Sequence, residues 1–307
     1  MPLPSARYRV EGRRAWYRST LEDELVGIVE RRRGLTYSDP GYVRSQYRDA
    51  SKLNARIALH KRFSTNAHGL HRWVFDQIGL PEEAGILDVG CGPGRLWEEN
   101  LDRLPERWSI TLTDASPGMI AEAEGSLGSD RRFACRVGNV QLLPFRSESF
   151  DAVVANHMLY HVPARPKALS EISRVLRAGG TLYATTNGEH THEEMGWMQR
   201  ILGPSRPPEG FFGTHLDFSL ENGAEQLSPY FSDVTLRRYC DALAVTEVEP
   251  VVAYLLSGSA ADAAAKRSAA DEFGRRVTEL VERLEHELAS RDAIRISKDT
   301  GLFVARK

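Results

Sequence analysis

Several features are scarce or missing in this sequence, and each excludes a class of protein. Among the 307 residues are 3 cysteines, Cys91, Cys135 and Cys240, and no CxxC pair, which argues against a disulfide framework and a zinc finger. No apolar run approaches the roughly 20 residues that a membrane-spanning helix needs. The segment from Met1 to Trp16 is rich in arginine but lacks the apolar centre of a secretory signal. These absences predict a cytoplasmic protein that makes no membrane contact and holds no metal.

A strong excess of charge of one sign is also missing. The formal net charge is -2, whereas a nucleic-acid-binding protein is typically basic. Residues 1–80 are an exception, because they hold 15 Lys and Arg against 8 Asp and Glu. Such an excess is usually a solvated face, although it can also attract an acidic substrate or a phosphate. We therefore expect a small-molecule partner, and an RNA substrate stays open as the alternative.

Short apolar runs alternate with helical patterns from residue 85 onward. Strands that alternate with helices pair in parallel through crossover connections, so the pattern predicts an α/β fold with an open, doubly wound sheet. A helix with an apolar face is expected before Gly179 and Gly180, which should end it. The predicted strands are Ile86–Val89, Ile110–Thr113, Phe133–Val137, Ala152–Ala155, Thr181–Ala184 and the final Gly301–Ala305.

Three regions stand outside this alternation. Residues 1–80 are predicted to form an N-terminal helical cap. Residues 188–230 are rich in proline, glycine and aromatic residues, which predicts an irregular insertion that covers the active site. Residues 260–290 are alanine-rich and charged with one apolar stripe, which predicts a long amphipathic helix.

The strongest local signal is the glycine turn that follows the first predicted strand. Gly90, Gly92 and Gly94 permit a tight turn and let a ligand approach the backbone. A dinucleotide-binding fingerprint needs its third glycine one position later, where this chain has Arg95. Asp88 ends the strand and would repel a pyrophosphate, whereas it would attract a ligand that carries an ammonium group. The turn therefore indicates a cationic nucleoside rather than a dinucleotide.

A second carboxylate ends the next predicted strand. Asp114 follows the turn by about twenty residues, the spacing expected of a side chain that holds ribose hydroxyls. Ser116 and Pro117 then open a helix as its N-cap and first residue. Met119 lies one turn into that helix, where it either packs on an adenine ring or simply fills the core.

At this point the order of motifs resembles that of class I S-adenosylmethionine-dependent methyltransferases. The similarity is nearest to the broad small-molecule group that includes the quinone-biosynthesis methyltransferases. It covers about residues 80–188 and the final strand. The motifs that carry it are Ile86–Gly94, Thr113–Met119, Leu143–Phe145 before Ser149–Asp151, and Arg174–Gly180.

The resemblance implies an overall architecture and a cofactor. Residues 81–307 would form the methyltransferase domain, a Rossmann-like, seven-stranded and mostly parallel sheet with an N-terminal helical cap and a C-terminal helical insertion. The cofactor would be S-adenosylmethionine and its product S-adenosylhomocysteine. The protein would be a monomer or a homodimer.

The resemblance also assigns roles to individual positions. Asp88 and the backbone around the glycine turn would hold the methionine part of the cofactor, and Asp114 would hold the ribose. Asn139 stands where the family usually has an acid that accepts from the adenine amino group, and its amide oxygen can still accept. The expected cofactor-binding residues are Asp88, Gly90, Cys91, Gly92, Gly94, Asp114, Ala115, Met119, Asn139, Val140 and Asn156.

Candidate groups for acid–base chemistry follow the fourth predicted strand. His157 and His161 are neighbours on one face if their segment is helical, and histidine is the natural base near neutral pH. A structural hydrogen bond is the competing explanation for each of them. A base matters only if the acceptor must lose a proton, because methyl transfer depends mainly on proximity and orientation.

Residues for the acceptor are expected from the cap and the insertion, where cap packing is the competing explanation. The expected acceptor-binding residues are Tyr47, His60, Phe63, Tyr160 and Trp197, with His190, His192, Phe211 and His215 as further candidates from the insertion.

Three other functions remain open on the sequence. An RNA methyltransferase is kept open by the basic excess in residues 1–80. A nicotinamide oxidoreductase is disfavoured by Arg95 and by the carboxylate of Asp88. A cofactor-binding protein of the same fold without methyl transfer stays possible, because a fold does not determine a function.

Overall fold

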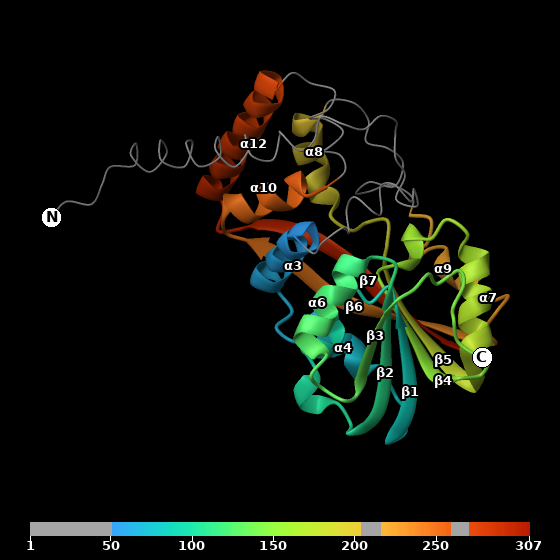
Figure 1. Ribbon diagram of the computed structural model, residues 1–307. Coiled ribbons are helices and arrows are strands. Elements are labelled where there is room, and N and C mark those ends of the chain that lie inside the picture. The colour runs from blue at the N-terminus through green and yellow to red at the C-terminus, as the bar shows by residue number, and fades with distance from the viewer. Residues whose placement is uncertain (1–50, 204–215, 259–269) are drawn as a thin grey trace.

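The computed structural model describes residues 51–203, 216–258 and 270–307, and these form one seven-stranded sheet flanked by helices (Figure 1). The strand order is β3-β2-β1-β4-β5-β7-β6. Neighbouring strands from β3 to β5 pair in parallel, and β7 is antiparallel to both of its neighbours. The strands are β1 (Glu83–Val89), β2 (Arg107–Asp114), β3 (Phe133–Val137), β4 (Phe150–Asn156), β5 (Leu176–Asn187), β6 (Asp233–Val245) and β7 (Ile294–Arg306).

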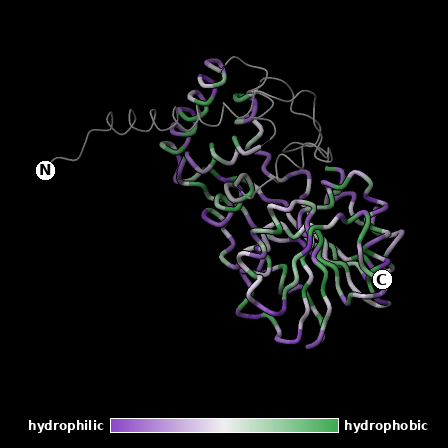
Figure 2. Tube along the Cα trace, viewed as in Figure 1, coloured by the Kyte–Doolittle hydropathy of each residue, from purple (hydrophilic) through white to green (hydrophobic). Residues whose placement is uncertain are grey.

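Both faces of the sheet are covered, because successive side chains of a strand point to opposite faces. In β1, Ile86 joins the core cluster formed with α4 (Leu70–Asp76), α5 (Arg95–Glu98) and α6 (Pro117–Leu127). Leu87 joins the opposite cluster, which α7 (Arg165–Val175) and α9 (Gly223–Leu227) cover. The hydrophobic residues accordingly follow the strands in Figure 2. Single-turn helices η1 (Leu101–Arg103), η2 (Leu159–His161) and η3 (Glu193–Met195) complete the connections.

A second apolar core lies beside one end of the sheet. β6 and β7 are 13 residues each and pair along their full length. Their shared end carries Leu243 and Ile296 into a cluster with four helices, α3 (Ser51–Phe63), α8 (Gly196–Leu202), α10 (Val248–Leu256) and α12 (Ala270–Ser290). Figure 1 shows these helices grouped above the sheet. The long β6–β7 ladder thus fixes the helical layer against the sheet.

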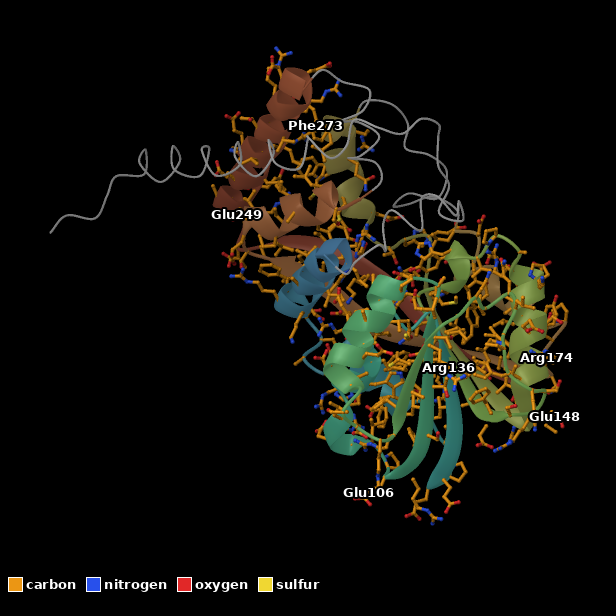
Figure 3. The ribbon with its side chains drawn as sticks, viewed as in Figure 1. Glu106, Arg136, Glu148, Arg174, Glu249 and Phe273 are labelled. Carbon is orange, nitrogen blue, oxygen red and sulfur yellow. The ribbon has the colours of Figure 1, made fainter. Side chains whose placement is uncertain are left out.

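The carboxyl ends of the parallel strands face this helical layer. Glu106 and Glu148, which precede β2 and β4, lie at the lower end of the sheet in Figure 3, and Phe273 of α12 lies at the opposite, upper end. Strand order reverses between β1 and β4, and open α/β sheets bind ligands beyond the carboxyl ends at such a point. The fold therefore places a ligand site between the sheet and the helical layer.

The predicted fold class is confirmed, and two details differ from expectation. The helix expected to end at Gly179 and Gly180 ends at Val175, because β5 begins at Leu176 and pairs with Phe150 there. Helix α4 was assigned to the cap, but Val74 and Phe75 pack into the sheet's own core. Tyr47, Phe211, His215 and the cap's first 50 residues lie outside the described residues.

Candidate functional site

One cavity of about 1480 Å³ lies at the strand switch point. Its wall combines the glycine turn after β1 and the ends of β2 and β4 with side chains from α3, α10 and β7. Pockets for a single small ligand usually measure about 300–1,000 Å³. The cavity therefore has room for two molecules side by side.

The glycine turn forms one wall, and its backbone conformation explains the glycines. Gly90, Gly92 and Gly94 have φ of 65°, 56° and 77°, a left-handed region that side chains disfavour. A Cβ on Gly90 would lie 2.8 Å from Met158 Cβ, and one on Gly94 would lie 2.7 Å from Leu127 Cδ1. Near Gly92 the closest atom is Leu53 Cδ2 at 3.8 Å, so this position opens onto the cavity.

Asp88 brings a nearly buried carboxyl group to the cavity, with 1% of the residue exposed. Its Oδ2 accepts a 2.7 Å hydrogen bond from Trp97 Nε1. Its Oδ1 is buried and has no hydrogen-bond partner among the described residues. The pKa of Asp88 is raised to about 7, mainly by burial; the Trp97 hydrogen bond opposes this rise, and the charge of Asp114 adds a smaller rise. An unpartnered carboxylate oxygen of this kind suits a cationic ligand group.

Asp114 faces Asp88 from the end of β2. Its Oδ2 accepts from the Gly92 N–H at 3.0 Å and its Oδ1 from the Ser116 N–H at 2.8 Å. Burial raises its pKa, although these backbone hydrogen bonds oppose that shift. The contacts fix the carboxylate between the glycine turn and the first turn of α6, where both strand ends border the cavity.

The predicted adenine-side residues also border the cavity. Ala115, Met119 and Val140 line it, and Met119 is 1% exposed. The Ser116 side chain caps α6 by accepting from the Met119 N–H at 3.3 Å. Asn139 lines the same wall, and its Oδ1 accepts from the Gln141 N–H at 2.9 Å. One lone pair of that oxygen is thus already used, and an adenine amino group would have to bind the other.

The end of β4 positions Asn156 and His157. Thr185 of β5 donates to Asn156 Oδ1 at 2.5 Å and accepts from the His157 N–H at 3.0 Å. This anchoring holds His157 at a φ of 49°. The pKa of His157 is lowered to about 3, mainly by burial and in smaller part by the charges of His71, Lys298 and His161. His157 is therefore a neutral imidazole at physiological pH.

His157 and His161 do not share a helix face. The left-handed backbone conformation at His157 prevents a continuous helix from His157 to His161. His161 is the last residue of the short helix η2. Both side chains line the cavity together with Tyr160, whose ring lies edge-on to His161 at 4.5 Å. The two histidines are thus brought to one cavity by a turn rather than by helical spacing.

Histidines from distant segments meet on the opposite wall. His60 of α3 stacks on His192 at 5.3 Å between ring centroids, and Tyr254 of α10 lies edge-on to both. The Tyr254 hydroxyl lies 3.2 Å from His192 Nδ1. Burial lowers the pKa of His60 well below its usual value, and it lowers that of His192 to about 3. Lys298 of β7 lines the cavity beside them.

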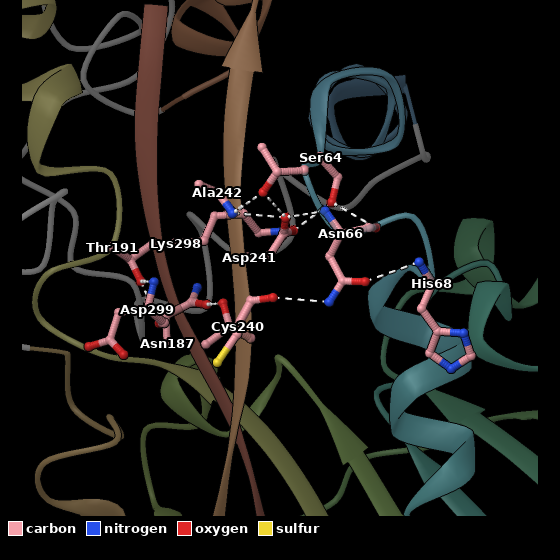
Figure 4. Close-up of polar contacts among 12 residues, drawn as sticks. Ser64, Asn66, His68, Asn187, Thr191, Cys240, Asp241, Ala242, Lys298 and Asp299 are labelled. Carbon is pink, nitrogen blue, oxygen red and sulfur yellow. Dashed lines mark hydrogen bonds and ion pairs between the residues drawn. The ribbon is translucent and has the colours of Figure 1, made fainter.

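Lys298 is held by a buried ion pair that Figure 4 shows. Its ammonium contacts Asp241 Oδ2, whose side chain is fully buried. Asp241 also accepts from Ser64 Oγ at 2.6 Å and from the Asn66 N–H at 3.0 Å. The segment after α3 is thereby tied to β6 and β7.

Some expected residues lie away from the cavity. Phe63 is buried in the helical core beneath Arg62. Trp197 packs on α12, with the Arg283 guanidinium 4.6 Å from its ring centroid. His190 is exposed and pairs with Glu193 at 2.6 Å, which raises the pKa of His190.

Among the residues with described structure, no group of three metal-ligating side chains could hold a metal ion. No described helix is long and apolar enough to cross a bilayer.

Sequence reasoning missed Trp97, Tyr254 and Lys298. Trp97 follows the glycine turn by three residues, so its proximity to Asp88 was a usable local signal. Tyr254 lies in an apolar helix and resembles an ordinary core residue. Lys298 precedes the predicted final strand, and only the pairing of β6 with β7 brings it to the cavity.

The sequence is similar to those of known methyltransferases. Residues 87–184 match the family described as "Methyltransferase domain", which spans the glycine turn, Asp114 and the β4 end. A malonyl-[acyl-carrier protein] O-methyltransferase of Geobacter sulfurreducens is 31% identical over 173 residues, which are 56% of this chain and 62% of that protein. A ubiquinone/menaquinone biosynthesis C-methyltransferase of Paracoccus denitrificans is 34% identical over 122 residues, 37% of this chain and 48% of that protein.

The structural comparison concerns the fold alone. A phosphoethanolamine N-methyltransferase 2 of Haemonchus contortus, solved with S-adenosylhomocysteine, has a TM-score of 0.53 at 19% identity and covers 89% of this chain and 60% of its own. The chain thus spans less than two thirds of the length of both curated relatives. Residues 87–184 nevertheless match the methyltransferase domain family, and both curated relatives are methyltransferases, the similarity that the motif order predicted.

Proposed function

We propose that this chain transfers a methyl group from S-adenosylmethionine to a small-molecule acceptor. The observation that supports this proposal most directly is the pair of buried carboxyl groups at the glycine turn. Asp88 has a carboxylate oxygen without a hydrogen-bond partner among the described residues, and Asp114 accepts hydrogen bonds from two backbone N–H groups. They suit the ammonium and the ribose of such a cofactor, respectively. The cavity beside them is large enough for a second molecule.

The residues present fit this cofactor. Asp88 Oδ1 would accept from its ammonium group, while Gly92 keeps the backbone open to it. Ala115, Met119 and Val140 offer an apolar surface to the adenine ring. When bound, the cofactor supplies a methyl group that its sulfonium already activates, so the protein's part is to orient the acceptor and exclude water.

The histidines at the cavity orient rather than deprotonate. His157 is neutral at physiological pH, and its pKa of about 3 makes it a weak base. A neutral imidazole both donates and accepts a hydrogen bond, so His157 can fix an acceptor near the end of β4. We assign this orienting role to His157 and, at the same wall, to His161 and Tyr160.

We infer a domain arrangement that follows from the two cores. Helices α3, α8, α10 and α12 with the shared end of β6 and β7 would form the cap over the acceptor. The remaining strands and α4 to α7 would form the cofactor-binding part.

Transfer is tested by product formation. We expect S-adenosylhomocysteine to accumulate when the protein is given S-adenosylmethionine and panels of carboxylic acids, phenols, amines and thiols. Asp114→Ala should lose that product, whereas Asp233→Ala, an exposed carboxylate of β6, should not. If the protein binds the cofactor but forms no product with any acceptor class, the result would favour a cofactor-binding protein without methyl transfer. Product only with RNA, with strongly salt-dependent RNA binding, would favour the RNA methyltransferase.

A further inference from the structure

One part of the cavity lies apart from the residues to which we assign the cofactor. We call it the acceptor compartment, and it is lined by His60, Thr191, His192, Tyr254, Lys298 and Thr300. These residues come from α3, the segment after β5, α10 and β7. The role that we assign to this compartment rests on the proposed function.

Hydrogen-bonding groups concentrate in the compartment although it is largely buried. His60 Nδ1 is buried and has no hydrogen-bond partner among the described residues. The Tyr254 hydroxyl, the two stacked imidazoles and two threonines surround the same space. A buried polar atom without a partner is costly, so a ligand that bonds to it is stabilised. The compartment is thus suited to a polar group rather than to a purely apolar one.

The charged side chains that line this side of the cavity are basic. Lys298 and Arg56 line this side of the cavity. No Asp or Glu lines it among the described residues of α3, α10, β7 and 187–192. Asp241 pairs with Lys298 from outside the compartment. Burial is the main cause of the lowered pKa of His60, His157 and His192, and the charge of Lys298 contributes to each. An ammonium has three donors, and Asp241 is its single carboxylate partner among the described residues.

We propose that the acceptor compartment receives a small acceptor that already carries a negative charge on oxygen, a carboxylate or an ionised phenol, and that this oxygen is methylated. Lys298 and the imidazole and tyrosine N–H and O–H groups would hold the charged group, since charge-assisted hydrogen bonds are the strong ones. A cationic amine would be repelled by Lys298 and would find no carboxylate there.

This chemistry also fits the weak basicity of the surrounding histidines. A lone pair of the acceptor oxygen forms the new O–CH₃ bond while the S–CH₃ bond breaks and its electron pair stays on sulfur. The negative charge of the acceptor and the positive charge of the sulfonium cancel in the products. No proton is transferred, so no general base is needed.

Calorimetric titration of the S-adenosylhomocysteine-saturated protein tests the proposal. The probes share one ring: benzoate, 4-nitrophenolate, benzyl alcohol and benzylamine, each at millimolar concentrations. We expect benzoate or 4-nitrophenolate to bind at least about tenfold more tightly than the alcohol and the amine. The anion that binds more tightly then shows whether the acceptor is a carboxylate or a phenolate.

A charge-removing variant shows whether Lys298 causes the preference. Lys298→Met alone would leave Asp241 buried without its partner, so the double variant Lys298→Met/Asp241→Asn is used. We expect the preferred anion to bind about tenfold more weakly, with unchanged affinity for S-adenosylhomocysteine. Arg295→Met removes an exposed cation from the same strand outside the cavity and should change neither. His60→Gln is a second variant, which leaves the ion pair intact, and it should also weaken the binding of the preferred anion.

Three results would overturn the proposal: no anion binding at millimolar concentrations, equal binding of benzylamine or benzyl alcohol, or an anion preference that survives in both the double variant and His60→Gln. Failure of S-adenosylhomocysteine to bind the wild-type protein would instead refute the proposed function. The two failures are therefore distinguishable within one experiment.

Discussion

At the residue scale, burial acts on the acids and the histidines of the cavity in opposite directions. It raises the pKa of Asp88 and lowers those of His60, His157 and His192, because in each case it disfavours the charged form. The wall near the glycine turn can therefore become negative near neutral pH while the histidines stay neutral. The proposed cationic cofactor and polar acceptor would thus be separated by the chemistry of single side chains.

Cofactor affinity should depend on the ionisation of Asp88. Its pKa of about 7 means that the carboxylate forms as pH rises through 7, and a cofactor ammonium binds only that form well. We expect the affinity for S-adenosylhomocysteine to fall as pH is lowered from 8 to 5, approaching about tenfold per pH unit below 7. Calorimetry in buffers of different ionisation enthalpy should show proton release on binding at pH 6. Asp88→Asn should bind weakly with no such pH dependence, and a pH-independent wild type would contradict the assignment.

The same group affects stability with the opposite sign. Because the folded-state pKa of Asp88 lies above the unfolded value of 3.8, the protonated form is favoured by the fold. Its contribution to the free energy of unfolding is present below pH 3.8 and is lost as pH rises to about 7.

Trp97→Phe removes the hydrogen bond that lowers the pKa of Asp88, so it should move the pH dependence of cofactor binding to higher pH. An unchanged binding profile would show that Trp97 does not tune Asp88.

Asp114 should account for much of the cofactor's binding free energy. Asp114→Ala removes a carboxylate that two backbone N–H groups position, and we expect affinity to fall by about 1–3 kcal/mol. Titration with S-adenosylmethionine measures the change, with Asp233→Ala as the exposed control. Unchanged affinity in Asp114→Ala would remove the ribose assignment.

At the element scale, local sequence patterns predicted the sheet better than the acceptor wall. The glycine turn, Asp114 and the alternating strands are local in sequence, so their periodicity and spacing predicted the fold and several residues that line the cavity. Lys298 and Tyr254 reach the cavity only because β6 pairs with β7 over 13 residues and supports α10. Such long-range pairing leaves no local pattern. The condition that His157 lies in a helix is not met for a similar reason, since Thr185 of β5 accepts a hydrogen bond from its backbone N–H.

The glycine turn gives a matched pair of substitutions. Gly92→Val and Gly94→Val share a left-handed backbone, but a side chain at Gly92 points into open space whereas one at Gly94 meets Leu127. We expect Gly92→Val to lose cofactor binding with the smaller loss of stability, and Gly94→Val to lose more stability. Chemical denaturation and titration with S-adenosylhomocysteine separate the two effects. Normal cofactor binding by Gly92→Val would mean that the turn does not contact the ligand.

At the scale of the whole molecule, the two apolar cores enclose one cavity between them. We propose that the sheet provides the wall for the cofactor, and that the helical layer at the β6–β7 end provides the acceptor compartment. The buried Asp241–Lys298 pair joins the two parts, since it ties the segment after α3 to both long strands. The cofactor should therefore stabilise the whole protein by mass action, by about 2.7 kcal/mol at one hundred times its dissociation constant.

The central claim is that the glycine turn and its two carboxylates bind a cationic sulfur nucleoside. Calorimetric titration with S-adenosylmethionine, S-adenosylhomocysteine and NADH tests it most directly. We predict micromolar binding of the first two and none of the third. Binding of NADH, or no binding of either sulfur nucleoside, would contradict the roles given to Asp88, Asp114 and the glycine turn.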